Sequence, residues 1–206
     1  MSQSFNPVTA IVLAGGFSRR MAVGNKLLQP LGKHSILRQT VLTLLQASCV
    51  QTLVVLGHDS ENVRASLAGL NVDFIQNKQA EEGMAASLRA GVGALKPKHD
   101  FLICLADMPF VQPQTIRAIY EARKANSGLS IWRPTFLGQP GHPILWAHHY
   151  ANDFLQLQGD TGGRKLLQNN RQALALVPVN DAGILQDIDT DADLHRFRHL
   201  QDAKRA

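Results

Sequence analysis

The sequence has little of what marks secreted, membrane or zinc-binding proteins. It contains only two cysteines, Cys49 and Cys104, and no C-x-x-C pair, which excludes a disulfide framework and a zinc site built on thiolates. No apolar stretch has the length of a transmembrane helix. The N-terminus has neither a basic segment nor a small-residue cleavage site, so it does not resemble a signal peptide. We therefore expect a cytoplasmic protein with no membrane partner, in which Cys104 is a small buried hydrophobic residue.

Basic residues are in excess, but they are not gathered into one block. The 206 residues carry a net charge of +5, and 45% are hydrophobic and 18% charged, which is typical of a globular domain. Part of the positive charge lies in the last helix and tail, from Arg196 to Arg205. No basic block with interleaved aromatics indicates a nucleic-acid partner, and small anionic substrates account for the charge equally well.

Strand-like and helix-like segments alternate over the first 125 residues. Helical spacing of apolar residues predicts helices at 35–46, 61–67, 83–94 and 113–124. Short apolar runs predict strands at 10–14, 51–56, 72–75 and 101–106. Because these strands are apolar throughout, they predict a mostly parallel sheet with helices on both faces, an α/β fold.

The regular alternation ends near residue 127. The Pro- and Gly-rich segment 130–146 predicts strands with an irregular connection, residues 160–169 a helix and residues 174–178 a last strand. In the closing segment, Thr190 and Asp193 have the spacing of a capping box at a helix start. No linker or repeat divides the chain, so we expect one domain over residues 1–206, with its core at about 8–200.

The most informative segment is VTAIVLAGGFSRRMAVGNK, residues 8–26. An apolar strand leads directly into Gly15-Gly16, and Ser18, Arg20 and Lys26 follow. Glycines let backbone N–H groups approach an anion, and arginine and lysine add positive charge. We interpret this loop as a binding site for a nucleoside triphosphate, against the alternative of a generic strand-to-helix turn. Its glycine spacing is neither that of a Walker A loop nor that of a dinucleotide-binding fingerprint.

Two carboxylate segments are candidates for a magnesium site. Asp107 directly follows a predicted strand, and ligands of open α/β sheets bind beyond the carboxyl ends of the strands. Magnesium prefers such oxygen ligands and bridges phosphates. Asp187 and Asp189 alternate around Ile188, so extended backbone would place both on one side, and we favour Asp189 slightly as the second ligand. The alternatives are that Asp107 caps a turn and that Asp189 begins a helix.

Three further segments are candidates for substrate contacts. Small residues around Gly83 and Ser87 would let a ring or phosphate approach a helix start. His142 lies between glycine and proline in GQPGHP, where it binds a ligand or fixes the loop. The segment GDTGGR, residues 159–164, presents an arginine at another glycine-flanked helix start. Plain helix packing and capping are the alternatives for the first and the third.

Together these segments resemble the molybdenum cofactor cytidylyltransferases, which are relatives of the cofactor guanylyltransferases among the nucleoside-triphosphate transferases. The matching segments run in order from about Val8 to about Leu200: LAGGFSRRM…NK, GMAASLRAG, LADMP, GQPGHP, GDTGGR and DIDTDADL. The resemblance implies a Rossmann-like three-layer α/β/α sandwich of the nucleotide-diphospho-sugar transferase type. It also implies a magnesium-dependent reaction in which the phosphate of molybdopterin attacks the α-phosphorus of CTP and pyrophosphate leaves. The product would serve a client molybdoenzyme of the xanthine dehydrogenase type.

The segments and the resemblance give each candidate residue a role. Those expected to bind the nucleotide are Leu13, Ala14, Gly15, Gly16, Ser18, Arg20, Lys26, Gly83, Ser87 and Asp107. Arg20, Lys26 and Asp107 are the expected catalytic residues, and Asp107 and Asp189 the expected metal ligands. Expected contacts with the second substrate are His142, Asp160, Gly162 and Arg164. Because the attacking phosphate is already an anion, positioning and charge neutralisation suffice and no general base is needed.

Two departures from the family pattern keep alternatives open. The cytidylyl branch usually has Ala-Ala-Gly where this chain has Ala14-Gly15-Gly16, and Gly-Gly is more typical of the guanylyl branch. A GTP-dependent molybdenum cofactor guanylyltransferase, or another NTP transferase, is therefore the alternative. Ala22 stands where the family usually has glycine, which keeps a non-catalytic carrier of the molybdenum cofactor as an alternative. A nicotinamide-dependent oxidoreductase is a third alternative, against which the missing dinucleotide fingerprint weighs.

Overall fold

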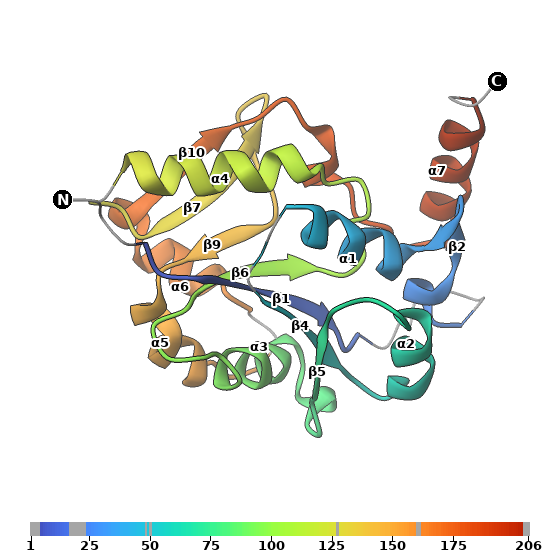
Figure 1. Ribbon diagram of the computed structural model, residues 1–206, viewed down its shortest axis with the longest axis horizontal. Helices are drawn as coiled ribbons and strands as arrows, with labels where there is room; N and C mark the ends of the chain where they lie inside the picture. The colour runs from blue at the N-terminus through green and yellow to red at the C-terminus, as the bar shows by residue number, and fades with distance from the viewer. Residues whose placement is uncertain are drawn as a thin grey trace.

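One central sheet organises the molecule, with helices packed against both of its faces (Figure 1). The computed structural model describes residues 5–16, 24–47, 49, 51–126, 128–159 and 162–203. The strand order is β10-β7-β9-β6-β1-β4-β5, with β8 paired to β7. Strands β1, β4, β5 and β6 are mutually parallel, β7 and β10 are parallel to each other, and β9 is antiparallel to both of its neighbours. The predicted α/β class with a mostly parallel sheet is confirmed.

The sheet strands are β1 (Val8–Ala14), β4 (Gln51–Leu56), β5 (Asp73–Gln76), β6 (Asp100–Leu105), β7 (Ile131–Phe136), β8 (Gln139–Pro140), β9 (Ile144–Trp146) and β10 (Leu174–Pro178). A separate hairpin pairs β2 (Pro30–Leu31) with β3 (His34–Ser35). The α-helices are α1 (Ile36–Gln46), α2 (Ser60–Ser66), α3 (Met84–Gly93), α4 (Pro113–Ala125), α5 (Ala151–Leu155), α6 (Arg164–Asn169) and α7 (Asp191–Ala203). Short 3-10 helices are η1 (Lys26–Leu28), η2 (Ala80–Glu82), η3 (His148–Tyr150), η4 (Arg171–Ala173) and η5 (Ala182–Leu185).

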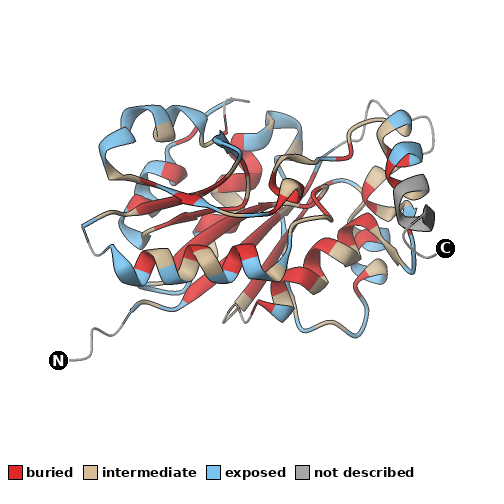
Figure 2. Ribbon diagram, turned by 90° about the horizontal axis from the view of Figure 1, so that it is seen from above, coloured by how far each residue is buried: buried red, intermediate tan, exposed pale blue. Residues whose placement is uncertain are grey.

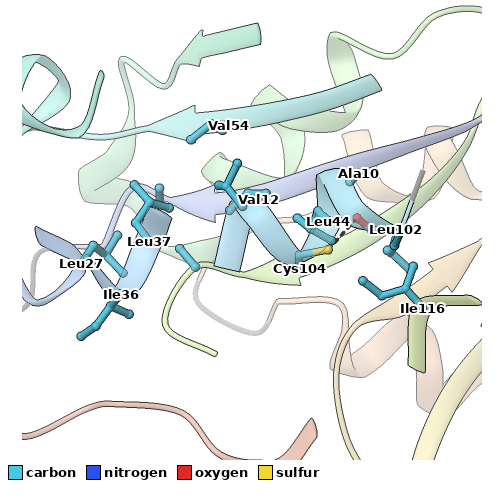
Figure 3. Close-up of a cluster of buried hydrophobic side chains, with 14 of the residues drawn as sticks. Ala10, Val12, Leu27, Ile36, Leu37, Leu44, Val54, Leu102, Cys104 and Ile116 are labelled. Atoms are coloured by element: carbon cyan, nitrogen blue, oxygen red, sulfur yellow. Dashed lines mark hydrogen bonds between the residues drawn. The ribbon is translucent and has the colours of Figure 1, made fainter. Parts of the chain in front are cut away.

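The two faces of the sheet bury separate apolar clusters, because side chains alternate along each strand. On one face Ala10 and Val12 of β1 pack with α1, α2, α4 and α7. Figure 3 shows this cluster, in which Cys104 lies near Leu44. On the other face Ile11 packs with α3 and α5. Figure 2 shows the buried strands in red between helices whose outer sides are exposed.

Gly91 lets helix α3 pack closely against the sheet. A Cβ atom at this position would lie 2.5 Å from Cγ2 of Ile11 and 3.0 Å from Cγ2 of Val55.

We expect Gly91→Ala to lower the free energy of unfolding by about 1–3 kcal/mol through overpacking. Gly93→Ala is the matched control, because a Cβ there would meet its nearest neighbour, Leu155, at 3.7 Å. The control should be neutral or raise stability by up to about 1 kcal/mol. Urea denaturation of both variants measures the difference, and equal stabilities would contradict the close contact.

Most predicted elements are found within one or two residues of their expected bounds. Cys104 is buried and free, as expected. Reciprocal hydrogen bonds between Thr190 and Asp193 confirm the capping box that begins α7. Helix α6 begins at Arg164, later than predicted, and α5 and the β2–β3 hairpin were not predicted. In the described part of the chain, no helix is both long and apolar enough to cross a membrane.

Candidate active site

A cleft of about 760 Å³ opens at the carboxyl ends of β1 and β6. Segments from across the chain line it: Leu13, Gly15, Gly16, Lys26, Leu27, Ala80, Glu81, Glu82, Gly83, Met84, Ser87, Leu105, Asp107, Gly159, Asp187 and Asp189. Parallel strands bring their carboxyl ends to the same sheet edge, and so the loops that follow β1 and β6 meet there. The structure thus gathers most of the residues singled out in the sequence around one cavity.

Lys26 joins the two carboxylates that were candidates for metal binding. Its Nζ donates hydrogen bonds to Oδ2 of Asp107 and to Oδ1 of Asp189, both at 2.6 Å. Burial alone would lower the pKa of Lys26, but the attraction and hydrogen bonds of Asp107 and Asp189 outweigh it and raise that pKa above its usual value. Lys26 is therefore an ammonium at neutral pH.

Local backbone contacts hold this cluster in place. Asn25 caps η1, because its Oδ1 accepts from the N–H of Leu27 at 3.1 Å while its Nδ2 donates to Asp59 at 2.7 Å. The N–H of Ile188 donates to the carbonyl of Asp107 at 3.0 Å, which fixes the chain before Asp189 against the end of β6. The hydroxyl of Thr40 donates to the carbonyl of Ala106 at 3.0 Å. Hydrogen bonds to the main chain at Ala106 and Asp107 thus fix the backbone that carries Asp107, and the bond from Ile188 ties the segment before Asp189 to it.

Asp187 lines the same cleft, but it is Asp189 that bonds Lys26. Partial burial and the nearby charges of Asp189 and Asp107 raise the pKa of Asp187 above its usual value. The alternation around buried Ile188 therefore directs both carboxylates to the cleft, as the sequence indicated. Asp187 supplies a third carboxylate to this part of the cleft.

Glycines allow the segment after β1 to lie close both to the segment after β4 and to the start of α3. A Cβ atom at Gly57 would lie 2.5 Å from the carbonyl oxygen of Gly15, and one at Gly15 would lie 3.0 Å from Oγ of Ser87. Buried Asn77 donates from Nδ2 to Oγ of Ser87 at 3.1 Å. Sequence reasoning missed Gly57 and Asn77, although Gly57 directly follows a predicted strand just as Gly15 does, and that parallel could have revealed it.

The segment around Gly159 packs on the start of α3. The N–H of Ala85 donates to the carbonyl of Gly159 at 3.2 Å, and a Cβ atom at Gly162 would lie 2.8 Å from Sδ of Met84. Arg89 bonds the carbonyl of Leu157 at 2.7 Å and Glu82 at 2.7 Å. The structure therefore brings Gly159 and Gly162 beside the nucleotide-side candidates Gly83 and Ser87.

Several other candidates lie elsewhere. Ala14 is buried at the end of β1, and Arg164 is exposed at the start of α6, and neither is among the residues that line the cleft. His142 lines a separate cavity of only about 20 Å³. Ser18, Arg20, Ala22 and Asp160 fall outside the described residues. In the ranges that the structure describes, no three His, Cys, Asp or Glu side chains form a group that could hold a metal ion by themselves.

The ring of His142 is held in an apolar setting against β6. Burial, and then the charge of Arg133, lower the pKa of His142 from 6.5 to about 4, while a hydrogen bond with the backbone of Ile103 opposes the shift. Its Nδ1 is buried without a hydrogen-bond partner among the described residues. The imidazole is therefore neutral at physiological pH.

This lowered pKa predicts that the protein loses stability in mild acid. The unfolded chain takes up a proton on His142 near pH 6.5, whereas the folded protein does so only near pH 4. The stability from neutral His142 is therefore present above pH 6.5 and is lost as the pH falls towards 4. Between about pH 7 and about pH 5, we expect His142 to account for about 2 kcal/mol of lost stability. Urea denaturation of wild type and His142→Gln at both pH values measures this contribution, and an identical pH dependence in the two would contradict it.

The chain is similar to known proteins over most of its length. The model of the MobA-like NTP transferase domain family matches residues 10–175. The chain is 30% identical over 192 residues to the molybdenum cofactor cytidylyltransferase of Escherichia coli strain K12, covering 90% of this chain and 93% of that protein. It is 26% identical over 198 residues to nicotine blue oxidoreductase of Paenarthrobacter nicotinovorans, covering 92% of this chain and 96% of that protein.

The chain is also similar to solved structures. The crystal structure of Rv0371c from Mycobacterium tuberculosis H37Rv superimposes with a TM-score of 0.84 and 29% identity, over 96% of this chain and 100% of that one. A second crystal structure of Rv0371c, in complex with manganese, gives a TM-score of 0.80 and 28% identity, over 94% of this chain and 99% of that one. The chain therefore belongs to the MobA-like NTP transferase domain family.

Proposed function

We propose that the protein is a magnesium-dependent nucleotidyltransferase that transfers CMP from CTP to the molybdopterin form of the molybdenum cofactor. The observation that carries this proposal is the cluster of Lys26, Asp107 and Asp189, which faces the cleft together with the glycines that follow β1. It combines a cation for phosphate oxygens with carboxylates for a divalent metal. Nucleotidyl transfer needs both, because it brings two polyanions together.

The donor set fits magnesium. Asp107 and Asp189 already share one cation, the ammonium of Lys26, so their oxygens converge on a common position. Carboxylate oxygens are hard ligands of the kind that magnesium prefers, and water and substrate phosphates complete its shell. Asp107 and Asp189 would hold the ion, and Asp187 lies in the same cleft. Bound there, magnesium would neutralise charge on the triphosphate. Rv0371c, to which this chain is similar, has been solved in complex with manganese, and this supports a divalent metal here.

The chain's own residues would act by binding and orientation. Gly15 and Gly16 lie at the carboxyl end of β1, where the absence of side chains lets phosphate or ribose come close to the backbone. Ser87 presents a hydroxyl to the cleft, and Asn77 fixes its orientation. Lys26 would bind phosphate oxygens on the triphosphate. The attacking group is the acceptor's phosphate, which needs no base, so catalysis rests on alignment and charge neutralisation.

The contact between Gly15 and Ser87 bears on the choice of base. Alanine at position 15 would place a Cβ atom 3.0 Å from Oγ of Ser87. The close approach of Ser87 is therefore a packing reason for glycine at position 15. For this reason Gly15 is not by itself evidence that the nucleotide is GTP. Similarity to the cytidylyltransferase of Escherichia coli over 90% of the chain supports CTP.

A second candidate is an oxidoreductase. It is favoured by the similarity to nicotine blue oxidoreductase over 92% of this chain. The cluster of Lys26, Asp107 and Asp189 favours phosphoryl transfer over this candidate. The absence of a dinucleotide-binding fingerprint from the sequence argues against a nicotinamide cofactor.

Pyrophosphate release tests the proposal and separates these candidates. The purified protein would be supplied with Mg²⁺, molybdopterin and each of the four nucleoside triphosphates in turn. We expect CTP to support the fastest release, with EDTA abolishing it. Equal use of all four triphosphates would contradict the assignment of CTP, and faster release from GTP would favour the guanylyl alternative. Oxidation of NADH or NADPH without pyrophosphate release would favour the oxidoreductase.

A further inference from the structure

Lys26 occupies the position of a cation between the two proposed metal ligands. Its hydrogen bonds to Asp107 and to Asp189 are each 2.6 Å long, and only 14% of its side chain is exposed. Bonds of this kind between ionised partners are among the stronger ones in proteins. Two carboxylates close to one ammonium largely neutralise its charge, which weakens its attraction for phosphate.

A divalent metal on the same carboxylates would meet this ammonium at close range. Like charges repel strongly where burial limits the screening by water. The lysine side chain can respond, because its stem of four carbons rotates freely, whereas the backbone at Lys26 is fixed by the Asn25 cap and by buried Leu27. The expected response to the metal is thus a swing of the side chain, with the backbone unmoved.

We propose that Lys26 and the divalent cation are alternative occupants of the Asp107–Asp189 pair, so that arrival of the metal releases Lys26 to bind phosphate. This inference rests on the proposed function and names how its site is regulated. Without metal, Lys26 holds the two carboxylates together. With metal, the same ammonium is available to the triphosphate. Metal and nucleotide therefore assist each other's binding, and by linkage the effect is reciprocal.

Binding of Mn²⁺ alone, without nucleotide, tests the exchange. In calorimetric titrations we expect Lys26→Met to bind Mn²⁺ at least about tenfold more tightly than wild type, because no ammonium has to be displaced. Adding Asp107→Asn to Lys26→Met should remove this gain. Lys124→Met is the matched control, since Lys124 pairs with Glu121 at the far end of α4 and should leave the affinity unchanged. Equal affinities of wild type and Lys26→Met would overturn the exchange.

A second measurement needs no substitution. Reductive methylation followed by peptide mass spectrometry reports how available each lysine amine is. We expect Mg²⁺ to raise the rate at Lys26 severalfold and to leave Lys124 unchanged. An unchanged rate at Lys26 under Mg²⁺ concentrations that support turnover would overturn the exchange.

These outcomes are distinguishable from failure of the proposed function. If turnover requires a divalent metal and Asp107 while Lys26 affects neither Mn²⁺ affinity nor its own methylation, the exchange fails and the proposed function stands. If pyrophosphate release proceeds in EDTA, or no triphosphate supports it, the proposed function fails together with the inference.

Discussion

Replacing Asp107 with alanine is expected to lower the rate of pyrophosphate release by about a hundredfold to a thousandfold, the range found when one preorganised contact that stabilises transition-state charge is removed. The carboxylate is one of the two that hold Lys26 and one of the two proposed metal ligands. Its loss would remove a proposed metal ligand and the hydrogen bond from Lys26 to position 107, while the bond from Lys26 to Asp189 would remain. The measurement is a steady-state assay with CTP, Mg²⁺ and molybdopterin.

The fold should survive this change. The hydrogen bond that ties position 107 to Ile188 uses the carbonyl of Asp107 and not its side chain. The urea midpoint of Asp107→Ala should therefore stay close to that of wild type. Glu121→Ala, which removes an exposed carboxylate on α4, is the control and should keep full activity. If Asp107→Ala releases pyrophosphate at the normal rate, the assignment of the metal site is wrong.

Replacing Asp100 with alanine should lower the free energy of unfolding by more than any other single substitution named here. Asp100 is 4% exposed and forms an ion pair with Arg123, whose side chain is 9% exposed. Its Oδ1 also accepts from Nδ2 of Asn6 at 3.1 Å and from the N–H of His148 at 2.9 Å. Removing the carboxylate leaves the guanidinium buried with its charge uncompensated. We expect a loss of about 3–5 kcal/mol, which corresponds to a fall in Tm of about 6–20 °C.

Two variants sharpen this prediction. Lys124→Ala removes a neighbouring ion pair whose partners are 52% and 69% exposed, and we expect it to cost about 0.5 kcal/mol or less. Adding Arg123→Met to Asp100→Ala should recover part of the lost stability, because the unpaired charge is removed as well. Asp100 begins β6 and Asp107 follows its other end, so Asp100→Ala should keep its activity at temperatures where it remains folded. Equal Tm values for the Asp100 and Lys124 variants would contradict the role of the buried pair.

The parts of the site that follow from local pattern were predictable from the sequence. An apolar strand that ends in Gly15-Gly16 and another that ends at Asp107 are visible in the residue order, and parallel strands must bring both ends to one sheet edge. The position of the Lys26 ammonium between Asp107 and Asp189 was not predictable from the sequence. Lys26 and Asp189 are 163 positions apart, and their contact depends on the bond from Ile188 to the carbonyl of Asp107.

Elements without a local signal were missed. Helix α5 is five residues long, and no side chain caps its start. Asn77 bonds Ser87 only because the fold places the end of β5 beside α3. No spacing of residues in the sequence predicts that arrangement. His142 was interpreted through its rigid Gly-Pro surroundings, yet those surroundings bring its ring near the backbone of Ile103 on β6 and not into the lining of the cleft. Sequence reasoning thus located the strand ends correctly, while side-chain direction came only with the structure.

We infer that this cleft transfers a cytidylyl group to a molybdopterin phosphate under the control of a divalent metal. Mass spectrometry of the product formed from CTP, molybdopterin and Mg²⁺ tests it most directly. We predict that the mass of molybdopterin increases by that of one cytidylyl group, with one pyrophosphate released per product, and that neither appears in EDTA or with Asp107→Ala. Molybdopterin recovered unmodified, with CTP intact in the presence of Mg²⁺, would contradict the account.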